Sequence, residues 1–239
     1  MEILTQFTTL EEQCSYLSDK MQRIHYKYID ECSNKYQNRL VKRGWRRFGQ
    51  LFLRPNCDGC SECKSIKIDV KNYEFSKSAR RVIRKNANTQ IVIQKPEVTQ
   101  EHIKLYNKFH AHQSKKKGWK HRTIEEDHYF NSFVDGANDF GKEVLYFSDK
   151  KLIGVDLIDM VDDGISSIYF FYDPDFAYLS LGNFSLYIQI NMAMELNLKW
   201  IYLGYYVKEC DSLNYKDKFK PYLTLQGDPT IKEKAIWKL

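Results

Sequence analysis

Residues 152–206 decide the fold, and they read LIGVDLIDMVDDGISSIYFFYDPDFAYLSLGNFSLYIQINMAMELNLKWIYLGYY. Two apolar runs, Leu152–Val161 and Ile165–Tyr172, flank the tripeptide Asp162-Asp163-Gly164. An Asp-Gly step between two apolar runs is a strong signal for a tight β-hairpin, because glycine tolerates the positive φ that such turns need. We therefore expect two antiparallel strands that are joined at this tripeptide.

In the second half of the stretch, the spacing of the apolar residues changes. Apolar residues recur at helical spacing over 183–196, on a face that contains Leu186, Ile190, Ala193 and Leu196. Trp200–Tyr205 is rich in aromatic and β-branched residues, which favours a third strand. This order of elements is typical of an α+β, acyltransferase-like core. We expect the sheet to splay where the second strand leads into the helix, leaving a crevice for a ligand; an ordinary α+β core without a site is the alternative.

Length and composition narrow the class of protein. The chain has 239 residues, which suits one large domain or two modest ones. No apolar run approaches the roughly 20 residues that span a bilayer. The first residues, MEILTQFTTLEEQC, lack the basic and apolar segments of a secretory signal. We therefore expect no membrane association, a cytoplasmic protein, and six cysteines that are mostly reduced.

The net charge of +6 is spread unevenly. Between Lys71 and Arg122 lie 14 Lys and Arg but only three Asp and Glu, a local charge of +11 that leaves −5 for the rest. Within this region a helix capped by Ser76 or Ser78 would place four cations on one flank, namely Arg80, Arg81, Arg84 and Lys85. This geometry suits contact with phosphates, so we predict nucleic-acid binding; a solvated, charge-rich surface is the alternative.

A second helix is expected from Thr99 to about Ser114. Lys115-Lys116-Lys117 would end it, with charge that suits a helix C-terminus.

Six cysteines fall into two groups. Cys57, Cys60 and Cys63 form a C-x2-C-x2-C run around Gly59, and Cys14 is the obvious fourth thiol. Thiolates at this spacing can converge on zinc or an iron–sulfur cluster, whereas the alternative is a reduced, packed cysteine loop. The other two, Cys32 and Cys210, have no spaced companion and are expected to be buried thiols.

Several short strings occur in a fixed order along the chain. They include Cys14-Ser15-Tyr16-Leu17, Gly44-Trp45-Arg46-Arg47, Cys57-Asp58-Gly59-Cys60, Tyr172-Asp173-Pro174-Asp175, Ser180-Leu181-Gly182, Tyr202-Leu203-Gly204-Tyr205 and Tyr215-Lys216. Together they resemble the arginyl-tRNA–protein transferase family, and within it the short bacterial branch. One departure is Leu17, which stands where eukaryotic members carry a second cysteine. It puts a eukaryote-style cluster in doubt, or shifts the fourth ligand to Cys63.

The resemblance implies an activity and a domain organisation. It implies transfer of an aminoacyl group from tRNA to the α-amine of proteins that begin with Asp or Glu, marking them for degradation. The bacterial branch implies leucine, and hence leucyl-tRNA, although the residues leave arginine open. The implied fold is a GNAT-like acyltransferase domain with a mixed central sheet flanked by helices, over 76–239, preceded by a smaller cysteine-bearing N-terminal domain over 1–75.

The chemistry would be aminolysis of an activated ester, which requires no cofactor. We expect backbone N–H groups near Gly182, at the start of the 183–196 helix, to stabilise the oxyanion. Asp159 or Asp163 would accept the ammonium proton. Tyr205 and Tyr206 would position the tRNA 3′ end or donate to its leaving oxygen, with core packing as their alternative role.

An acidic N-terminal side chain requires a cationic receptor, and arginine suits a carboxylate. We expect Arg46 and Arg47 to supply it, with Lys216 third and Tyr16 of the first motif beside them. A surface pair that holds acidic parts of the chain is the alternative for the arginines.

Two other functions remain open from sequence alone. One is a CoA-dependent N-acetyltransferase of the GNAT class, although the loop before the helix keeps only Gly182 of the glycine-rich pattern that cradles a pyrophosphate. The other is a non-enzymatic RNA-binding protein built on a metal knuckle and a basic helix.

Overall fold

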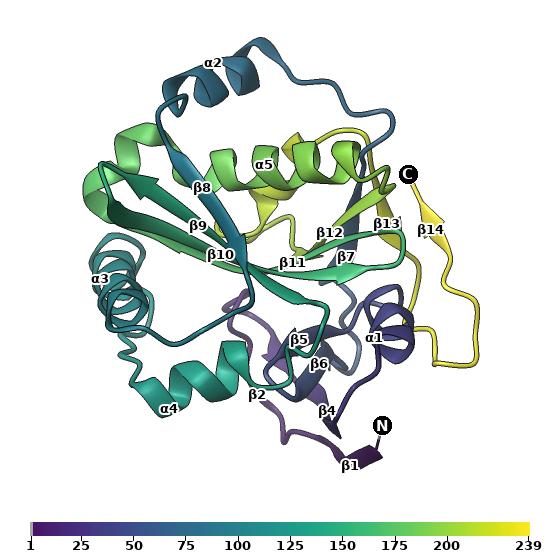
Figure 1. Ribbon diagram of the computed structural model, residues 1–239. Coiled ribbons are helices and arrows are strands. Elements are labelled where there is room, and N and C mark those ends of the chain that lie inside the picture. The colour runs from purple at the N-terminus through teal and green to yellow at the C-terminus, as the bar shows by residue number, and fades with distance from the viewer. Residues whose placement is uncertain (1) are drawn as a thin grey trace.

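The computed structural model describes residues 2–239 and has an α+β fold with one large mixed sheet (Figure 1). Its eight strands lie in the order β14-β13-β7-β12-β11-β10-β9-β8. Every neighbouring pair is antiparallel except β11 and β12. The strands are β7 (Lys64–Asp69), β8 (Gln90–Gln94), β9 (Gly141–Ser148), β10 (Lys151–Val161), β11 (Gly164–Tyr172), β12 (Trp200–Tyr206), β13 (Tyr222–Leu225) and β14 (Trp237–Lys238). The expected α+β class with a mixed central sheet is confirmed.

The predicted hairpin is confirmed, but its glycine is needed for a reason other than the conformation of the turn. Val161 of β10 pairs with Gly164 of β11, so Asp162 and Asp163 form the connection. Gly164 does not have a left-handed φ. A Cβ atom on Gly164 would instead lie 2.3 Å from the carbonyl oxygen of Trp200. Glycine is therefore required here because β12 passes too close for a side chain.

Helices cover both faces of the large sheet (Figure 1). Helix α5 (Leu181–Glu195) begins two residues before the predicted start and packs on one face, against a core that includes Ile153, Ile165 and Ile201. Helix α3 (Gln100–Lys117) packs on the other face, against Val155 and Phe171. The remaining helical segments are α1 (Asn34–Val41), α2 (Lys77–Lys85), α4 (Glu126–Tyr129), the π-helical η1 (Phe130–Val134), and the 3₁₀ segments η2 (Pro174–Leu179) and η3 (Asn214–Lys218).

The N-terminal part forms a second, four-stranded antiparallel sheet in the order β1-β4-β6-β5. Its strands are β1 (Glu2–Thr8), β4 (Ile24–Asp30), β5 (Arg46–Phe48) and β6 (Leu51–Pro55), and a small ribbon joins β2 (Glu12–Gln13) to β3 (Met21–Gln22). Strand β7 precedes the expected domain boundary at residue 75 but lies inside the large sheet, between β12 and β13. The division into 1–75 and 76–239 stays a prediction.

A buried ion pair joins the two sheets. Arg47 of β5 donates from Nε and Nη2 to the two carboxylate oxygens of Asp159 of β10, at 2.9 and 2.7 Å. Gln37 of α1 donates to the same carboxylate at 2.5 Å. Arg47 is 4% exposed and Asp159 is fully buried. Such a pair is held by its hydrogen bonds, and removing one partner leaves a charge stranded away from water.

None of the helices in residues 2–239 has the length and apolar character that crossing a bilayer requires.

We predict that Asp159→Asn lowers the free energy of unfolding by about 3–5 kcal/mol, because Arg47 keeps its charge without a counterion. Urea unfolding at neutral pH measures this loss. The matched control is Asp162→Asn on the same hairpin, where the carboxylate is half exposed and pairs with Lys42 at the surface. The control should change stability by less than about 0.5 kcal/mol. Equal losses for the two variants would contradict a structural role for the buried pair.

Candidate active site

The two parallel strands of the large sheet separate after three residue pairs. β11 and β12 pair only where Gly164–Ser166 lies beside Trp200–Tyr202, and they diverge from Ser167 onward. The pairing of β10 with β11 is also irregular at this point, between Leu157 and Ile158. The predicted splay of the sheet is therefore confirmed. We call this point the strand fork.

Arg46 of β5 occupies the strand fork. Its Nη2 donates to the carbonyl oxygens of Ser167 and Ile168, at 3.1 Å for Ile168. Its guanidinium group lies against Gly204 of β12, where a Cβ atom would come within 2.8 Å of Arg46 Cζ. Gly204 has φ +75°, which glycine adopts without strain. The arginine thus supplies partners to carbonyl groups that the separated strand no longer pairs.

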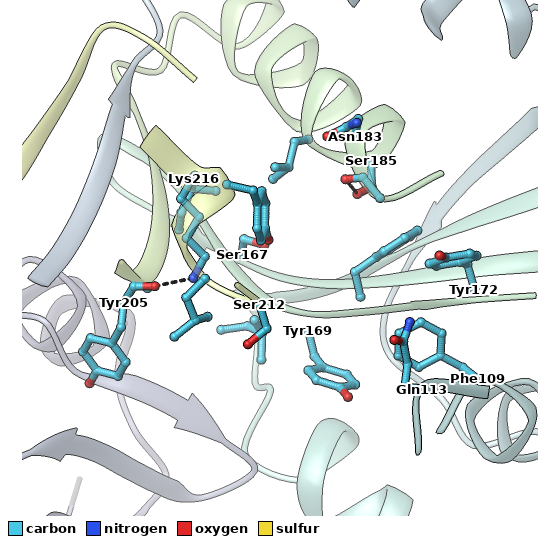
Figure 2. Close-up of a pocket in the computed structure, with 18 of the residues that line it drawn as sticks. Phe109, Gln113, Ser167, Tyr169, Tyr172, Asn183, Ser185, Tyr205, Ser212 and Lys216 are labelled. Carbon is cyan, nitrogen blue, oxygen red and sulfur yellow. Dashed lines mark hydrogen bonds between the residues drawn. The ribbon is translucent and has the colours of Figure 1, made fainter. Parts of the chain in front are cut away.

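A cavity of about 610 Å³ opens from the strand fork. Figure 2 shows Lys216 and Tyr205 on one side of it, and Phe109, Gln113 and Tyr172 on the other. Gly182 and Asn183, from the start of α5, form part of its wall, and so does Tyr16. Three cations line it, Arg46, Lys117 and Lys216, whereas no Asp or Glu within residues 2–239 does. The cavity therefore suits an anionic group better than a cationic one.

Lys216 is the most buried of these cations, with 8% of its surface exposed. Its Nζ donates to the carbonyl oxygen of Tyr205 at 2.5 Å (Figure 2). Burial, followed by the charge of Arg46, lowers the pKa of Lys216 to about 7. Within the described chain, neither Arg46 nor Lys216 forms an ion pair with a carboxylate. Both are available to a ligand that brings its own negative charge.

Three of the predicted site residues have other partners, and their expected roles are corrected. Arg47 and Asp159 bind each other and are buried, so neither the guanidinium nor the carboxylate is open to a substrate. Asp163 lies at the hairpin turn, where it pairs with Lys42 and accepts a hydrogen bond from Tyr202. It does not line the cavity, so the role of proton acceptor is not supported for Asp163 either.

The two predicted tyrosines also differ from each other. The Tyr205 hydroxyl donates to the carbonyl oxygens of Gly44 and Leu53, at 2.8 and 3.2 Å, so the side chain anchors the N-terminal sheet. Tyr205 is part of the cavity wall, and its backbone carbonyl accepts the hydrogen bond from Lys216. The Tyr206 hydroxyl contacts Asp217 at 3.4 Å, and Tyr206 is not part of the cavity wall.

Sequence reasoning missed a buried polar chain beside the cavity. Asp156 of β10 is fully buried, and burial raises its pKa to about 7. The Gln189 amide nitrogen donates to Asp156 Oδ2 at 2.8 Å and to Ser167 Oγ at 3.3 Å. Ser167 lines the cavity, and because its oxygen accepts from Gln189, its hydroxyl hydrogen is directed elsewhere. The sequence feature that could have revealed this chain is Asp156 itself, a second carboxylate three residues before Asp159 in an otherwise apolar run.

The predicted basic helix is confirmed as an element. Ser76 caps α2 by accepting from the N–H group of Ala79 at 3.1 Å. The four cations proposed to bind tRNA are all exposed, and they are Arg80, Arg81, Arg84 and Lys85. Arg80, Arg81 and Arg84, but not Lys85, line a groove along α2 that shares no residue with the cavity. Their role in binding tRNA stays a prediction.

Cys57, Cys60 and Cys63 line a second pocket, which shares Tyr205 with the cavity. Burial, and then the neighbouring thiols of Cys14, Cys57 and Cys60, raise the pKa of Cys63 to about 12. All six cysteines are unpaired, and Cys32 and Cys210 are buried as predicted. In residues 2–239, however, no group of three or more His, Cys, Asp or Glu side chains is placed to hold a metal ion. The zinc or iron–sulfur site therefore stays a prediction from the cysteine spacing.

Two family models match the chain. One, described as "Arginine-tRNA-protein transferase, C terminus", covers residues 101–226, and the other, described as "Arginine-tRNA-protein transferase, N terminus", covers residues 12–81.

Two bacterial proteins that are similar to this chain along nearly its whole length share one name. A protein of Campylobacter jejuni subsp. jejuni serotype O:6 is 50% identical over 96% of this chain and 96% of its own, and is named aspartate/glutamate leucyltransferase. A protein of Helicobacter hepaticus with the same name is 39% identical over 99% of this chain and 98% of its own.

Solved structures resemble the chain more distantly. The C-terminal domain of a putative lysylphosphatidylglycerol synthetase from Agrobacterium fabrum has a TM-score of 0.45 at 11% identity, over 61% of this chain and 46% of that one. FemX has a TM-score of 0.44 at 8% identity, over 59% of this chain and 52% of that one. Both scores are below the level at which a shared fold can be argued.

Proposed function

The chain belongs to the arginine-tRNA-protein transferase family, and from this premise we propose that it transfers leucine from leucyl-tRNA to the α-amine of proteins that begin with Asp or Glu. The name shared by its relatives supports both the transferred residue and the acceptor. The new N-terminus would mark the acceptor protein for degradation. With the family established, the CoA-dependent and the non-enzymatic alternatives are set aside.

The observation that carries the proposal is the charge of the cavity. Arg46 and Lys216 are cations without carboxylate partners in the described chain, and both reach the strand fork. An N-terminal Asp or Glu side chain would supply the carboxylate partner that both cations lack. Charge-assisted hydrogen bonds of this kind are strong. The same cavity offers no carboxylate, within residues 2–239, to an arginyl group. Its apolar wall, which includes Leu181, Leu186 and Phe170, suits a leucyl side chain instead.

The reaction makes modest chemical demands. A free α-amine has a pKa of roughly 7.7–8.0, so a useful fraction is neutral near pH 7. Its nitrogen attacks the ester carbonyl, the amide bond forms, the bond to the ribose oxygen breaks, and the amine proton ends on that oxygen. Holding amine and ester in contact supplies much of the acceleration, and no cofactor takes part in this proposal.

The start of α5 is the group we propose for the oxyanion. The N–H groups of Asn183 and Phe184 both donate to Ser180, while those of Leu181 and Gly182 have no backbone acceptor among the described residues. Gly182 lies on the cavity wall. Free N–H groups at the first turn of a helix favour negative charge. This supports the role that the sequence suggested for Gly182.

We also propose that the large sheet with α3 and α5 is a GNAT-like acyltransferase domain, which the strand fork supports. The cysteine-bearing segment up to residue 75 would be a smaller domain that contributes Tyr16 and Arg46 to the cavity. A reaction that consumes charged tRNA would take place in the cytoplasm, where tRNA is charged.

The direct test mixes the protein with leucyl-tRNA or arginyl-tRNA and with peptides that begin with Asp, Glu, Asn or Lys. Mass spectrometry of the peptide should show addition of one leucine to the Asp and Glu peptides, and little or no addition of arginine. The Asn peptide serves as the isosteric, uncharged control. Peptides unchanged in mass with both charged tRNAs, or leucine added to the Lys peptide as readily as to the Asp peptide, would refute the proposal.

The pKa of Lys216 makes acidic-peptide binding depend on pH. The pKa is lowered to about 7, so the side chain is charged below that pH and loses its charge above it. The peptide carboxylate stays ionised in this range. Without tRNA, the affinity for an Asp peptide should fall roughly fourfold between about pH 6 and pH 7.5, as the protonated fraction falls.

Calorimetry of Lys216→Met should show weaker binding that no longer varies with pH over this range. A variant that keeps the full pH dependence would assign the titration to another group.

A further inference from the structure

A strongly basic segment borders the cavity on the side opposite Lys216. Residues 115–122 read KKKGWKHR, five Lys and Arg in eight residues with one tryptophan. We call this the 115–122 segment. Gly118, with φ +67°, ends α3, and the chain continues without regular structure to Glu125. All five cations are exposed, and in residues 2–239 none of them pairs with a carboxylate. Their charge at the helix end accounts for Lys115–Lys117, but Lys120 and Arg122 lie beyond the helix.

Trp119 joins this charge to an aromatic wall. Its ring is half-buried and lies 6.4 Å from the Phe109 ring, edge to face. Phe109 in turn lies 5.2 Å from Tyr172. The Lys117 ammonium group is 5.7 Å from the indole centroid. Trp119 and Lys117 both line the cavity, so one edge of its mouth is a flat ring flanked by lysine.

An unsatisfied amide lies on the same side. Gln113 of α3 is 6% exposed, and its Oε1 has no hydrogen-bond partner in the described part of the chain. Figure 2 shows it beside Phe109 and near Tyr172, in the cavity wall. A buried amide oxygen without a partner costs free energy, which a ligand with a donor would recover. A glutamine amide presents one donor and one acceptor in a plane, which matches the edge of an adenine.

We propose that this end of the cavity binds the 3′-terminal nucleotide of the tRNA, with the base stacked on Trp119, its edge bonded to Gln113, and the preceding phosphates on the 115–122 segment. The inference deepens the proposed function and rests on it. Stacking of a base on an aromatic side chain combined with a basic track is the general way in which proteins hold single-stranded nucleic acid. The acidic end of the acceptor protein would then occupy the opposite side, at Arg46 and Lys216.

The basic residues of helix α2 are consistent with a tRNA that reaches the cavity from the side of the 115–122 segment. Helix α2 packs on α5, on the other face of the sheet from α3 (Figure 1). Its last residue, Lys85, places Nζ 5.7 Å from the ring of Tyr178 in η2, which is 60% exposed. Ser180, directly after η2, is on the cavity wall. A tRNA that contacts α2 and the 115–122 segment would therefore lie across the mouth of the cavity.

The five cations alone would also suit an acidic protein surface. The ring and the amide inside the cavity favour a nucleic acid, because a flat acidic surface would contact the lysines without entering the cavity. Binding measurements with intact and shortened tRNA separate the two kinds of partner.

The test measures binding of uncharged tRNA, and of the same tRNA lacking its terminal adenosine, to wild type, Trp119→Ala and Trp119→Phe. Trp119→Ala should weaken binding of intact tRNA by about 5- to 140-fold and leave binding of the shortened tRNA nearly unchanged. Trp119→Phe keeps a ring and should retain most of the affinity. Circular dichroism checks that the variants fold. We expect them to fold, because Trp119 lies outside the helices and strands.

The triple variant Lys115→Gln/Lys116→Gln/Lys117→Gln should weaken binding of both tRNAs. It should also lower the salt slope by about 0.7 for each phosphate of the single-stranded 3′ end that the protein no longer neutralises. The matched control, Lys232→Gln/Lys234→Gln, removes exposed charge from the C-terminal segment and should change neither the affinity nor the slope.

Other outcomes overturn the inference. Equal losses for both tRNAs in Trp119→Ala, or none, would remove the stacking role; competition by polyglutamate together with unchanged tRNA binding by Trp119→Ala would assign the segment to an acidic protein partner. If stacking fails while wild type still transfers leucine, only the subsite is wrong. If wild type transfers nothing but still distinguishes the two tRNAs through Trp119, the proposed function fails and the subsite stands.

Discussion

The separation of β11 from β12 is the constraint on which the rest of the molecule depends. Two parallel strands that part leave backbone groups without partners, and such groups are costly unless another donor reaches them. Arg46 from the N-terminal sheet supplies that donor to Ser167 and Ile168, and Gly204 leaves room for its guanidinium. The N-terminal sheet is therefore part of the cavity wall. It holds the strands apart and at the same time contributes a cation to the cavity.

Much of this core was predictable from sequence, because it depends on local pattern. The hairpin, the long helix and the third strand follow from periods of 2.0 and 3.6 and from one Asp-Gly step. The location of β7 was not predictable, since joining the large sheet is a long-range pairing that leaves no local signal. Of the N-terminal strands, Leu51–Pro55 was predictable as a short apolar strand, whereas the stretch before Leu40 could be helix or irregular strand for a related reason. The strands of that stretch are short and mixed in polarity, and their register comes from pairing with one another.

The site shows where composition stops being informative. Arg46 and Arg47 are adjacent and chemically identical, yet they point to opposite sides of β5, as strand geometry requires, and only one reaches the cavity. Asp156 and Asp159 share one strand, and the partner of each, Gln189 or Arg47, comes from a distant part of the chain. The lysines after Ser114 were explained by the preference of a helix C-terminus for positive charge. Their location beside Trp119 was therefore not predicted. In each case the residue type was visible and its partner was not.

The central claim is that two cations at the strand fork recognise the acidic N-terminus of the acceptor protein. It is tested most directly by kcat/KM for leucine transfer to Asp and Asn peptides, with wild type and with Arg46→Gln. A charge-assisted contact within the cavity should give wild type a preference for Asp of about 100-fold, and loss of one of two cations should reduce this to about tenfold. The same preference for Asp in both proteins, however active each is, would contradict the account.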